Sequence, residues 1–270
     1  MLVDLHIHTT FSDGTTPPLD IVKNAVKANL ECISITDHDN IDAFKILQEN
    51  KLLNHNTLKI IPGVELSIDN PLKYEVHILG YDIDFNNNTL QETLILIAQK
   101  RLERMQKIVK NLNDIGIKID YEQVLFLAPD SQAFGRPHIA RAMLNEGYTQ
   151  KIIYELLSTK SKVYVPKYKL SLEDALNLIT RANGKPVLAH PGLIGSDKIV
   201  KEIIQNKKIH WLEVFHPAHN ENSVDKYLNL AKTFNMKITG GSDYHGIGRY
   251  PEKLGMYVIE SSDINNFIDL

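Results

Sequence analysis

The stretch Val3-Asp4-Leu5-His6-Ile7-His8, near the start of the chain, alternates apolar and polar side chains and so predicts a β-strand. Side chains on a strand change face at every residue, so His6 and His8 point the same way and bring two imidazoles to one place. A carboxylate, Asp13, follows five residues later. This combination is typical of a metal site, although a hydrophobic strand with two surface histidines would give the same pattern.

The same arrangement recurs along the chain, where apolar runs end in a histidine or an acidic residue. The runs 32–35, 60–64, 74–76, 186–189 and 236–239 lead into Asp37-His38-Asp39, Glu65, His77, His190 and Asp243-Tyr244-His245, respectively. A single histidine after a strand is usually a surface residue. The repetition predicts that metal ligands gather at the carboxyl ends of several strands.

Helical patterns separate these runs, and the alternation predicts parallel strands with helices outside. One helix is expected after Thr15 or Thr16, with Pro17 near its first position, and another after Ser171, which forms a capping box with Asp174. Ligands at the carboxyl ends favour a barrel with its site on that face. An open doubly wound sheet is the alternative.

Between residues 99 and 166 the alternation stops, and only helices are predicted, over 100–115, 137–145 and 149–157. We therefore expect 99–166 to form a helical insertion, and 1–98 with 167–270 to form the barrel domain. The first helix carries basic residues beside its apolar stripe, which we expect to be a solvated face: Lys100, Arg101, Arg104, Lys107 and Lys110. The alternative is a cap that controls substrate access to the barrel mouth.

Composition narrows the class of protein. A chain of 270 residues is long enough for one α/β barrel. The net charge of −3 gives no overall attraction to nucleic-acid backbones or membrane surfaces. The single cysteine, Cys32, excludes an intrachain disulfide and fits a reducing compartment. We expect a cytoplasmic enzyme with a small-molecule substrate, no membrane segment and no obligate protein partner.

Taken together, the motifs resemble the PHP (polymerase and histidinol phosphatase) family. The residues that carry the resemblance are Asp4-Leu5-His6-Ile7-His8-Thr9, Ser12-Asp13-Gly14, Thr36-Asp37-His38-Asp39, Pro62-Gly63-Val64-Glu65, His77, Ala189-His190-Pro191 and Gly241-Ser242-Asp243-Tyr244-His245. The resemblance implies a distorted (β/α)7 TIM-like barrel with a trinuclear metal site on its carboxyl face. Within the family the chain is most similar to phosphoesterases that hydrolyse 3',5'-nucleoside bisphosphates or trim short RNA from the 5' end. These carry a helical insertion at this place, and Phe134-Gly135-Arg136-Pro137-His138 supports the subgroup.

Six imidazoles and three carboxylates are more than one tetrahedral ion needs, so we expect several divalent ions, with Mn, Fe and Zn all compatible with the ligands. The expected ligands are His6, His8, Asp13, His38, Glu65, His77, His190, Asp243 and His245. The family likeness assigns His6, His8, Glu65 and Asp243 to one ion, and Glu65, His77 and His190 to a third. It assigns Asp13, His38 and His245 to the second ion or to the sphere of residues around it.

The expected reaction is hydrolysis of a phosphate ester by a metal-bridging hydroxide. The candidate catalytic residues are Asp13, Glu65, His190, Arg136 and His216, and the candidate substrate-binding residues are Arg136, His138, His219 and Arg249. Of the two carboxylates beside His38, Asp37 and Asp39, one is expected to orient a histidine ligand and the other to cap a helix near Ile41.

Three alternatives stay open at this point. A histidinol-phosphate phosphatase would share the family motifs. A metal-dependent amidohydrolase is disfavoured, because no strand ends in a lysine that could bridge two ions after carbamylation. A catalytically inert metal-binding module would have closed coordination shells, whereas this site is expected to keep positions open to water.

Overall fold

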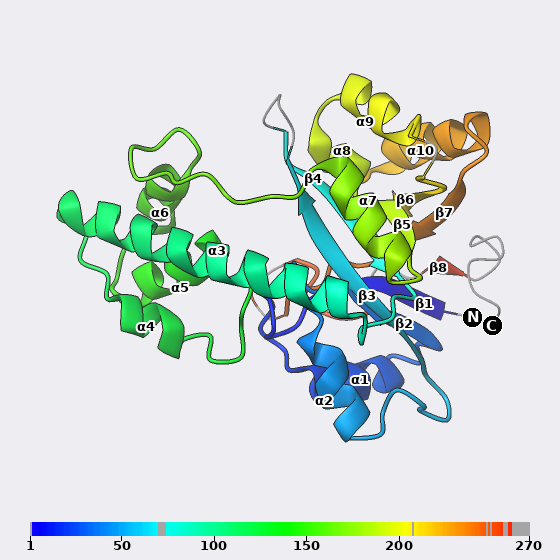
Figure 1. Ribbon diagram of the computed structural model, residues 1–270, viewed down its shortest axis with the longest axis horizontal. Helices are drawn as coiled ribbons and strands as arrows, with labels where there is room; N and C mark the ends of the chain where they lie inside the picture. The colour runs from blue at the N-terminus through cyan, green and yellow to red at the C-terminus, as the bar shows by residue number, and fades with distance from the viewer. Residues whose placement is uncertain are drawn as a thin grey trace.

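Seven strands, β1 to β7, curl into one nearly closed sheet at the centre of the protein (Figure 1). The computed structural model describes residues 2–69, 74–206, 208–246, 248, 250–255 and 259–260. The strands are β1 (Leu2–Ile7), β2 (Cys32–Ile35), β3 (Lys59–Ile68), β4 (Val76–Tyr81), β5 (Lys185–Leu188), β6 (Trp211–Phe215) and β7 (Lys237–Gly240). A short further strand, β8 (Ile259–Glu260), pairs antiparallel with the start of β1.

The barrel closes where the segment after β7 meets β1. Ile7 forms a parallel bridge with Tyr244, and the backbone N–H of His8 donates to the carbonyl of Tyr244 at 2.8 Å. Gly241 approaches so closely that a Cβ there would lie 2.3 Å from the backbone nitrogen of His6, so only glycine fits. The predicted barrel is therefore confirmed over the open doubly wound sheet.

β4 runs antiparallel to both of its neighbours, which corrects the expectation of parallel strands throughout. The link between β3 and β4 is too short for the crossover helix that a parallel pair needs. Glu65 lies within β3 rather than at its end, and His77 is the second residue of β4 rather than the residue after it. Because β4 is reversed, its amino end lies on the same barrel face as the carboxyl ends of the other strands.

Helices cover the outside of the barrel, and their apolar faces form a large core with the strands. They are α1 (Pro18–Lys27), α2 (Asp42–Glu49), α7 (Leu172–Arg181), α8 (Pro191–Ile194), α9 (Asp197–Ile204) and α10 (Glu221–Thr233). Ser171 caps α7, since its Oγ accepts from the backbone N–H of Asp174 at 3.1 Å, but the carboxylate of Asp174 accepts from the Ser171 hydroxyl rather than from the backbone N–H that a full capping box would use. At α1 the threonines do not cap the helix, because Pro17 occupies the N-cap position.

Four helices project to one side of the barrel: α3 (Asn88–Asp114), α4 (Tyr121–Phe126), α5 (Arg136–Asn145) and α6 (Gln150–Leu157). In Figure 1 the long helix α3 leads away from the sheet, and the other three lie around its far half. α3 begins at Asn88, earlier than predicted, because Asn87 caps it by accepting from the N–H of Leu90 at 3.0 Å. Its first turns pack on the barrel core, and from Met105 onward its apolar residues belong to a separate core. Among the described residues, no helix combines the length and the apolar character needed to cross a bilayer.

Candidate metal centre

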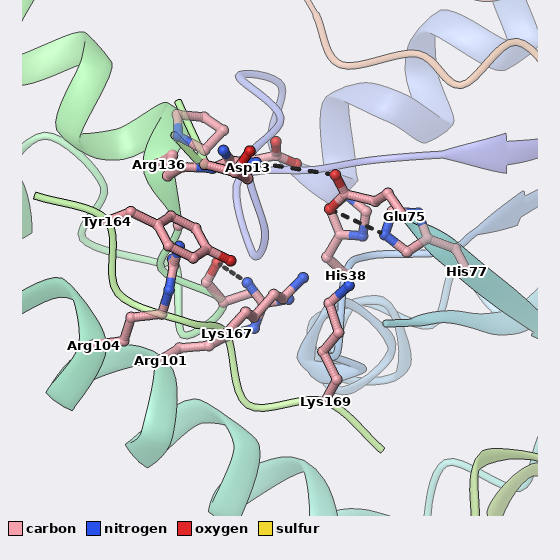
Figure 2. A pocket seen from close by; sticks show the side chains of 14 residues that line it. Asp13, His38, Glu75, His77, Arg101, Arg104, Arg136, Tyr164, Lys167 and Lys169 are labelled. Carbon is pink, nitrogen blue, oxygen red and sulfur yellow. Dashed lines mark hydrogen bonds and ion pairs between the residues drawn. The ribbon is translucent and has the colours of Figure 1, made fainter. Parts of the chain in front are cut away.

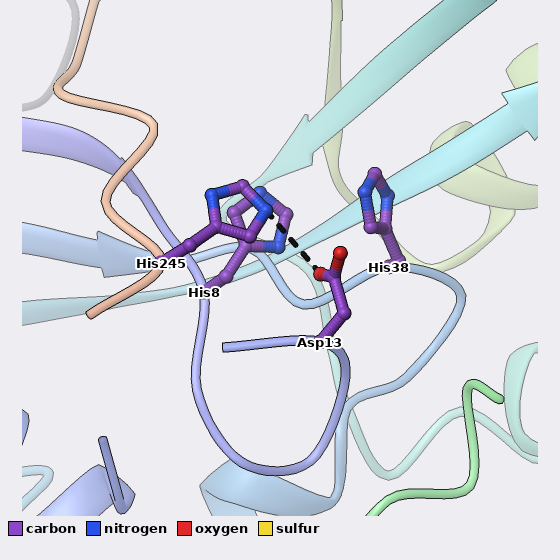
Figure 3. A group of neighbouring side chains, drawn as sticks. All are labelled: His8, Asp13, His38 and His245. Atoms are coloured by element: carbon purple, nitrogen blue, oxygen red, sulfur yellow. Dashed lines mark ion pairs between the residues drawn. The ribbon is translucent and has the colours of Figure 1, made fainter. Parts of the chain in front are cut away.

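The nine residues predicted as metal ligands come together at one face of the barrel. In four groups their ligand atoms lie within 4.8 Å of one another: His8, Asp13, His38 and His245; His6, His8 and Asp243; His6, Glu65 and His190; and His38, Glu65 and His77. Figure 3 shows the first group, in which Asp13 from the loop after β1 lies near three imidazoles from separate parts of the chain. The groups share members, so the residues form one continuous cluster.

Glu65 lies at the centre of this cluster and is almost fully buried. Its Oε2 lies 2.8 Å from His38 Nδ1, 3.3 Å from His8 Nε2 and 3.5 Å from His6 Nε2. Its Oε1 lies 2.8 Å from His77 Nδ1 and 2.9 Å from His190 Nε2. One carboxylate therefore touches five imidazoles, the position required of a ligand shared between ions.

Two further carboxylates lie on either side of Glu65. Oδ1 of Asp243 lies 3.1 Å from His8 Nε2 and 3.3 Å from His6 Nε2. Oδ1 of Asp13 lies 3.3 Å from His245 Nε2. The rings of His8 and His245 stack with their centroids 4.1 Å apart, so these two groups of ligands adjoin.

The backbone is strained at two of these candidate ligands. His190 has φ 23° and Asp243 has φ 51°, in the left-handed region that residues with a side chain rarely adopt. Such strain persists where the surrounding structure fixes the conformation, and it concentrates at functional sites. Here it directs the imidazole of His190 and the carboxylate of Asp243 into the cluster.

The donor atoms fit divalent cations. Among the residues that the structure describes, His6 Nε2, His8 Nε2 and Glu65 Oε2 are buried without a hydrogen-bond partner, although they face one another. Buried polar atoms that lack a partner are costly, and converging lone pairs of imidazole and carboxylate are the arrangement that a metal ion satisfies. A structural network would instead pair each donor with an acceptor.

The electrostatics of the cluster also favour cations. Burial would raise the pKa of Glu65, but the imidazoles of His38, His77 and His6 hold it well below its usual range. Burial would lower the pKa of His8, but the neighbouring carboxylates of Asp243 and Glu65 raise it to about 10. The carboxylates thus stabilise positive charge at the imidazoles strongly, and the same field stabilises bound divalent ions.

Glu213 is a buried carboxylate that we did not single out from the sequence. Its Oε1 lies 2.8 Å from His6 Nδ1, and its Oε2 accepts from the backbone N–H of His190 at 2.6 Å. A carboxylate on the second nitrogen of a histidine fixes which nitrogen faces the metal and strengthens it as a ligand. The signal in the sequence was a lone Glu inside the apolar strand β6.

We expect Glu213→Gln to weaken metal binding or activity by about 10- to 100-fold. Glutamine keeps the volume of the side chain but offers only one acceptor oxygen to the two N–H groups that Glu213 accepts from. The measurement is the concentration of Mn²⁺ that gives half-maximal phosphate release. Glu221→Gln, on the exposed first turn of α10, is the matched control. An unchanged metal requirement in Glu213→Gln would contradict this role.

Asp37 and Asp39 have structural roles that differ from the predicted roles. Asp37 accepts from the backbone N–H of Thr9 at 2.7 Å and from the hydroxyl groups of Thr9 and Ser12, so it shapes the loop that carries Asp13. Asp39 forms a buried ion pair with Arg101 of α3. Neither orients a histidine ligand or caps α2.

His138 also binds this loop rather than facing a substrate. Its Nε2 donates to the carbonyl oxygen of Ser12 at 2.9 Å, and its Nδ1 accepts from the N–H of Gly135 at 3.0 Å. Burial lowers its pKa to about 4, which keeps the ring neutral. Ser131 Oγ donates to the same carbonyl at 2.8 Å, so two residues of the helical segment hold the backbone beside Asp13.

His216 lies at the cluster, whereas His219 does not face it. Nδ1 of His216 accepts from the N–H of Ala218 at 3.0 Å, so Nε2 carries the hydrogen and points at Asp243 Oδ2, 3.3 Å away. His219 uses both ring nitrogens, donating to the carbonyl of Val214 and accepting from the N–H of Gly192, which leaves none for a phosphate. Arg249 lies outside the described residues.

A cavity of about 190 Å³ adjoins the cluster, and five arginine and lysine side chains contribute to its lining (Figure 2). Asp13, His38 and His77 line it from the barrel side. The cations of this basic cavity are Arg101, Arg104, Arg136, Lys167 and Lys169, and Glu75 is the further carboxylate. Arg101 and Arg104, which we expected on a solvated face of α3, are buried against the cavity.

The cations of the basic cavity crowd one another. Burial and the neighbouring guanidinium groups of Arg136 and Arg101 lower the pKa of Arg104 to about 10. Burial and Arg101 also lower the pKa of Lys167 to about 7. Like charges held together in a concave, partly buried site are stabilised by an anion, so the cavity can receive a phosphate beside the metal ligands.

Comparison with known proteins identifies the family. A family model described as the PHP domain matches residues 4–184. The chain belongs to the PHP family. The 5'-3' exoribonuclease Rnm of Salmonella typhimurium is 31% identical over 254 residues, which cover 91% of this chain and 85% of that protein. The 3',5'-nucleoside bisphosphate phosphatase of Chromobacterium violaceum is 26% identical and covers 94% of this chain and 90% of its own.

A solved structure supports the same assignment. A predicted metal-dependent phosphoesterase from Bifidobacterium adolescentis superposes with a TM-score of 0.84 at 28% sequence identity, covering 97% of this chain and 93% of that one. These matches confirm the PHP family, the barrel fold and the hydrolase class that the sequence predicts.

Proposed function

We propose that this PHP protein is a metal-dependent phosphoesterase that hydrolyses 3',5'-nucleoside bisphosphates and short RNA from the 5' end. The observation that carries the proposal is the basic cavity directly beside the metal-ligand cluster. A substrate with two phosphates needs one place where a phosphate reacts and a second where a phosphate is held. The relatives named as an exoribonuclease and a bisphosphate phosphatase support the same substrate class.

The nine ligands would hold the divalent ions, with three ions as the number that the ligand set suits and Glu65 shared between them. Mn, Fe and Zn are all compatible with imidazole and carboxylate ligands. Ions bound there would act as Lewis acids toward a phosphoryl group and would make water a stronger nucleophile at neutral pH. We assign Asp13, Glu65 and His190 to this metal-holding role in catalysis.

The protein's own side chains then orient the substrate. Arg136 and Lys167 are placed to bind the phosphate that does not react, because both are cations that line the basic cavity. The N–H at Nε2 of His216 points to the cluster and is placed to donate a hydrogen bond to the leaving oxygen. Arg101 holds the cavity wall, since it pairs with Asp39 and donates to the carbonyls of Ala133 and Phe134.

We also propose that residues 99–166 form a cap over the site. Arg101, Arg104 and Tyr164 of this segment face the barrel's His38 across the basic cavity (Figure 2). A wall contributed by an inserted segment limits which phosphoesters reach the ligands. The buried free thiol of Cys32 supports a reducing, cytoplasmic location, and no protein partner is required by the proposal.

The test is a screen of phosphate and nucleotide release with added Mn²⁺. The substrates are adenosine 3',5'-bisphosphate, a 5'-phosphorylated short RNA, histidinol phosphate and an aryl phosphate. We expect the first two to give the highest kcat/KM. Histidinol phosphate as the best substrate would favour the alternative phosphatase, and no metal-dependent turnover of any substrate would favour an inert metal-binding module.

The pKa of Lys167, about 7, makes substrate binding dependent on pH. Arg101 and Lys169 help burial to lower this pKa, and Asp39 and Glu75 oppose them. An anion binds the charged lysine, so above pH 7 binding must take up a proton and affinity falls by up to about tenfold per pH unit. Below pH 7 the lysine is already charged, and its contribution is constant.

Lys167→Arg should remove this dependence, because arginine stays charged at every pH tested. The measurement is the ratio of the KM of the native protein to that of Lys167→Arg for adenosine 3',5'-bisphosphate, from pH 6.5 to 8.5. Taking the ratio cancels titrations at the metal centre. We expect the ratio to rise above pH 7, and a flat ratio would contradict the assignment.

A further inference from the structure

A second hollow, of about 620 Å³, continues from the basic cavity along the helical segment. The two share Glu75, Arg136, Pro137 and Thr159 in their linings. The remainder of the second hollow lies between α5 and α6 and includes Ala140, Leu144, Ile153, Tyr154 and Leu157. We call it the α5–α6 groove, and at the shared residues it adjoins the place assigned to a phosphate.

The chemistry of the α5–α6 groove differs from that of the basic cavity. The exposed surface of its walls is mainly apolar, and its lining includes Tyr154, whose exposed fraction is 80%. The charged side chains in its lining, Glu75 and Arg136, lie at the shared end with their carboxylate and guanidinium groups 4.0 Å apart. An exposed aromatic ring with aliphatic neighbours suits a flat, uncharged, aromatic group, and an arginine plane at the entrance adds a further stacking surface.

The size of the basic cavity also indicates that an aromatic group of the substrate lies in the α5–α6 groove. At about 190 Å³ it is smaller than the roughly 300–1,000 Å³ that small-molecule sites usually have. One phosphate would lie at the metal ligands and the other among the cations, so the ribose would lie between them. The cavity then has no room for the base, which must extend out of it. The α5–α6 groove is the adjoining space.

We propose that the α5–α6 groove binds the nucleobase of the substrate, with Tyr154 as a stacking surface. This inference rests on the proposed function and deepens it. Stacking and aliphatic contact recognise the face of a base and not its hydrogen-bonding edge, so the groove accepts every base. It distinguishes a nucleotide from a sugar phosphate that lacks a base, and it favours purines for their larger stacking area.

The test compares adenosine 3',5'-bisphosphate with 1-deoxyribose 3,5-bisphosphate, which carries both phosphates but no base. Tyr154→Ala should lower kcat/KM for the adenosine substrate by about 5- to 100-fold, the range of one base–aromatic stack, and leave the base-free substrate unchanged. Tyr154→Phe keeps the ring and should retain the preference. Phe126→Ala, which removes another highly exposed ring from a different hollow, is the control.

Two outcomes would overturn the groove assignment while leaving the proposed function intact. One is an equal change, or no change, for both substrates in Tyr154→Ala. The other is a change of oligomeric state in Tyr154→Ala without a change in base preference, which would make the groove a contact between copies of the chain. If the native protein turned over neither substrate but did hydrolyse another phosphoester, the proposed function itself would fail, and the groove assignment with it.

Discussion

Glu65→Gln should lower kcat/KM by at least about a thousandfold on every phosphoester, because Glu65 is the carboxylate that the imidazoles of the metal centre share. Its two oxygens lie within 3.5 Å of His6, His8, His38, His77 and His190. Glutamine has the same shape but no charge and one acceptor oxygen instead of two. The site would lose the ligand that joins its parts.

Metal content and activity should fall together in this variant. The measurements are phosphate release with saturating Mn²⁺ and elemental analysis of the purified protein, with circular dichroism to establish that the barrel has folded. Glu92→Gln, an exposed residue on α3, is the control for the chemical change itself. A variant with native activity and native metal content would show that Glu65 is not a shared ligand.

Replacing Arg136 and Lys167 together by methionine should lower kcat/KM for adenosine 3',5'-bisphosphate by about a thousandfold, since hydrogen bonds to charged groups contribute roughly 1.5–3 kcal/mol each. Hydrolysis of an aryl phosphate should change by less than about threefold, because this substrate has no second phosphate for the cavity to hold. The expected result is therefore a change in specificity at an intact metal centre.

The matched control removes two basic residues of α3 that do not line the basic cavity, in the variant Lys100→Met/Lys107→Met. It changes the net charge equally and should leave both substrates unaffected. An equal loss on the bisphosphate and on the aryl phosphate in Arg136→Met/Lys167→Met would assign the two residues to the stability of the fold. Single variants should show intermediate losses.

The residues predicted as metal ligands lie together in the structure because their placement follows from simple geometry. A residue at the end of a barrel strand can face only the rim of the barrel, so runs that end in His38 or His190 identify rim positions without knowledge of the contacts between them. The same logic placed Asp243 and His245 after the last parallel strand. For these residues, the local sequence pattern and the overall fold lead to the same positions.

Two features of the site could not be predicted from the sequence pattern, because they depend on tertiary structure. The direction of β4 follows from the short link before it, and the apolar run before His77 gave no sign of the reversal. The burial of Arg101 depends on Asp39, which is 62 residues away in the chain. Periodicity on α3 alone shows only that Arg101 lies off the apolar stripe, and so the basic cavity could not be predicted.

His138 and His219 show a second limit of prediction from residue type. Each lies close in sequence to residues of the candidate site, and for that reason each was a candidate for binding a phosphate. In the structure both ring nitrogens of each are already used, with a backbone carbonyl among the partners of each. A histidine near a site can bind a ligand or fix a loop, and only its hydrogen bonds distinguish the two roles.

The central claim is that residues distant in the chain form one site for several divalent ions, and anomalous X-ray scattering from crystals of the purified protein tests it most directly. Data collected on either side of the Mn, Fe and Zn absorption edges should show ions beside Glu65, with ligands from His6, His8 and Asp243 on one side and His77 and His190 on the other. Anomalous maps without a peak at Glu65, from protein that still hydrolyses phosphoesters in the presence of a chelator, would contradict the claim.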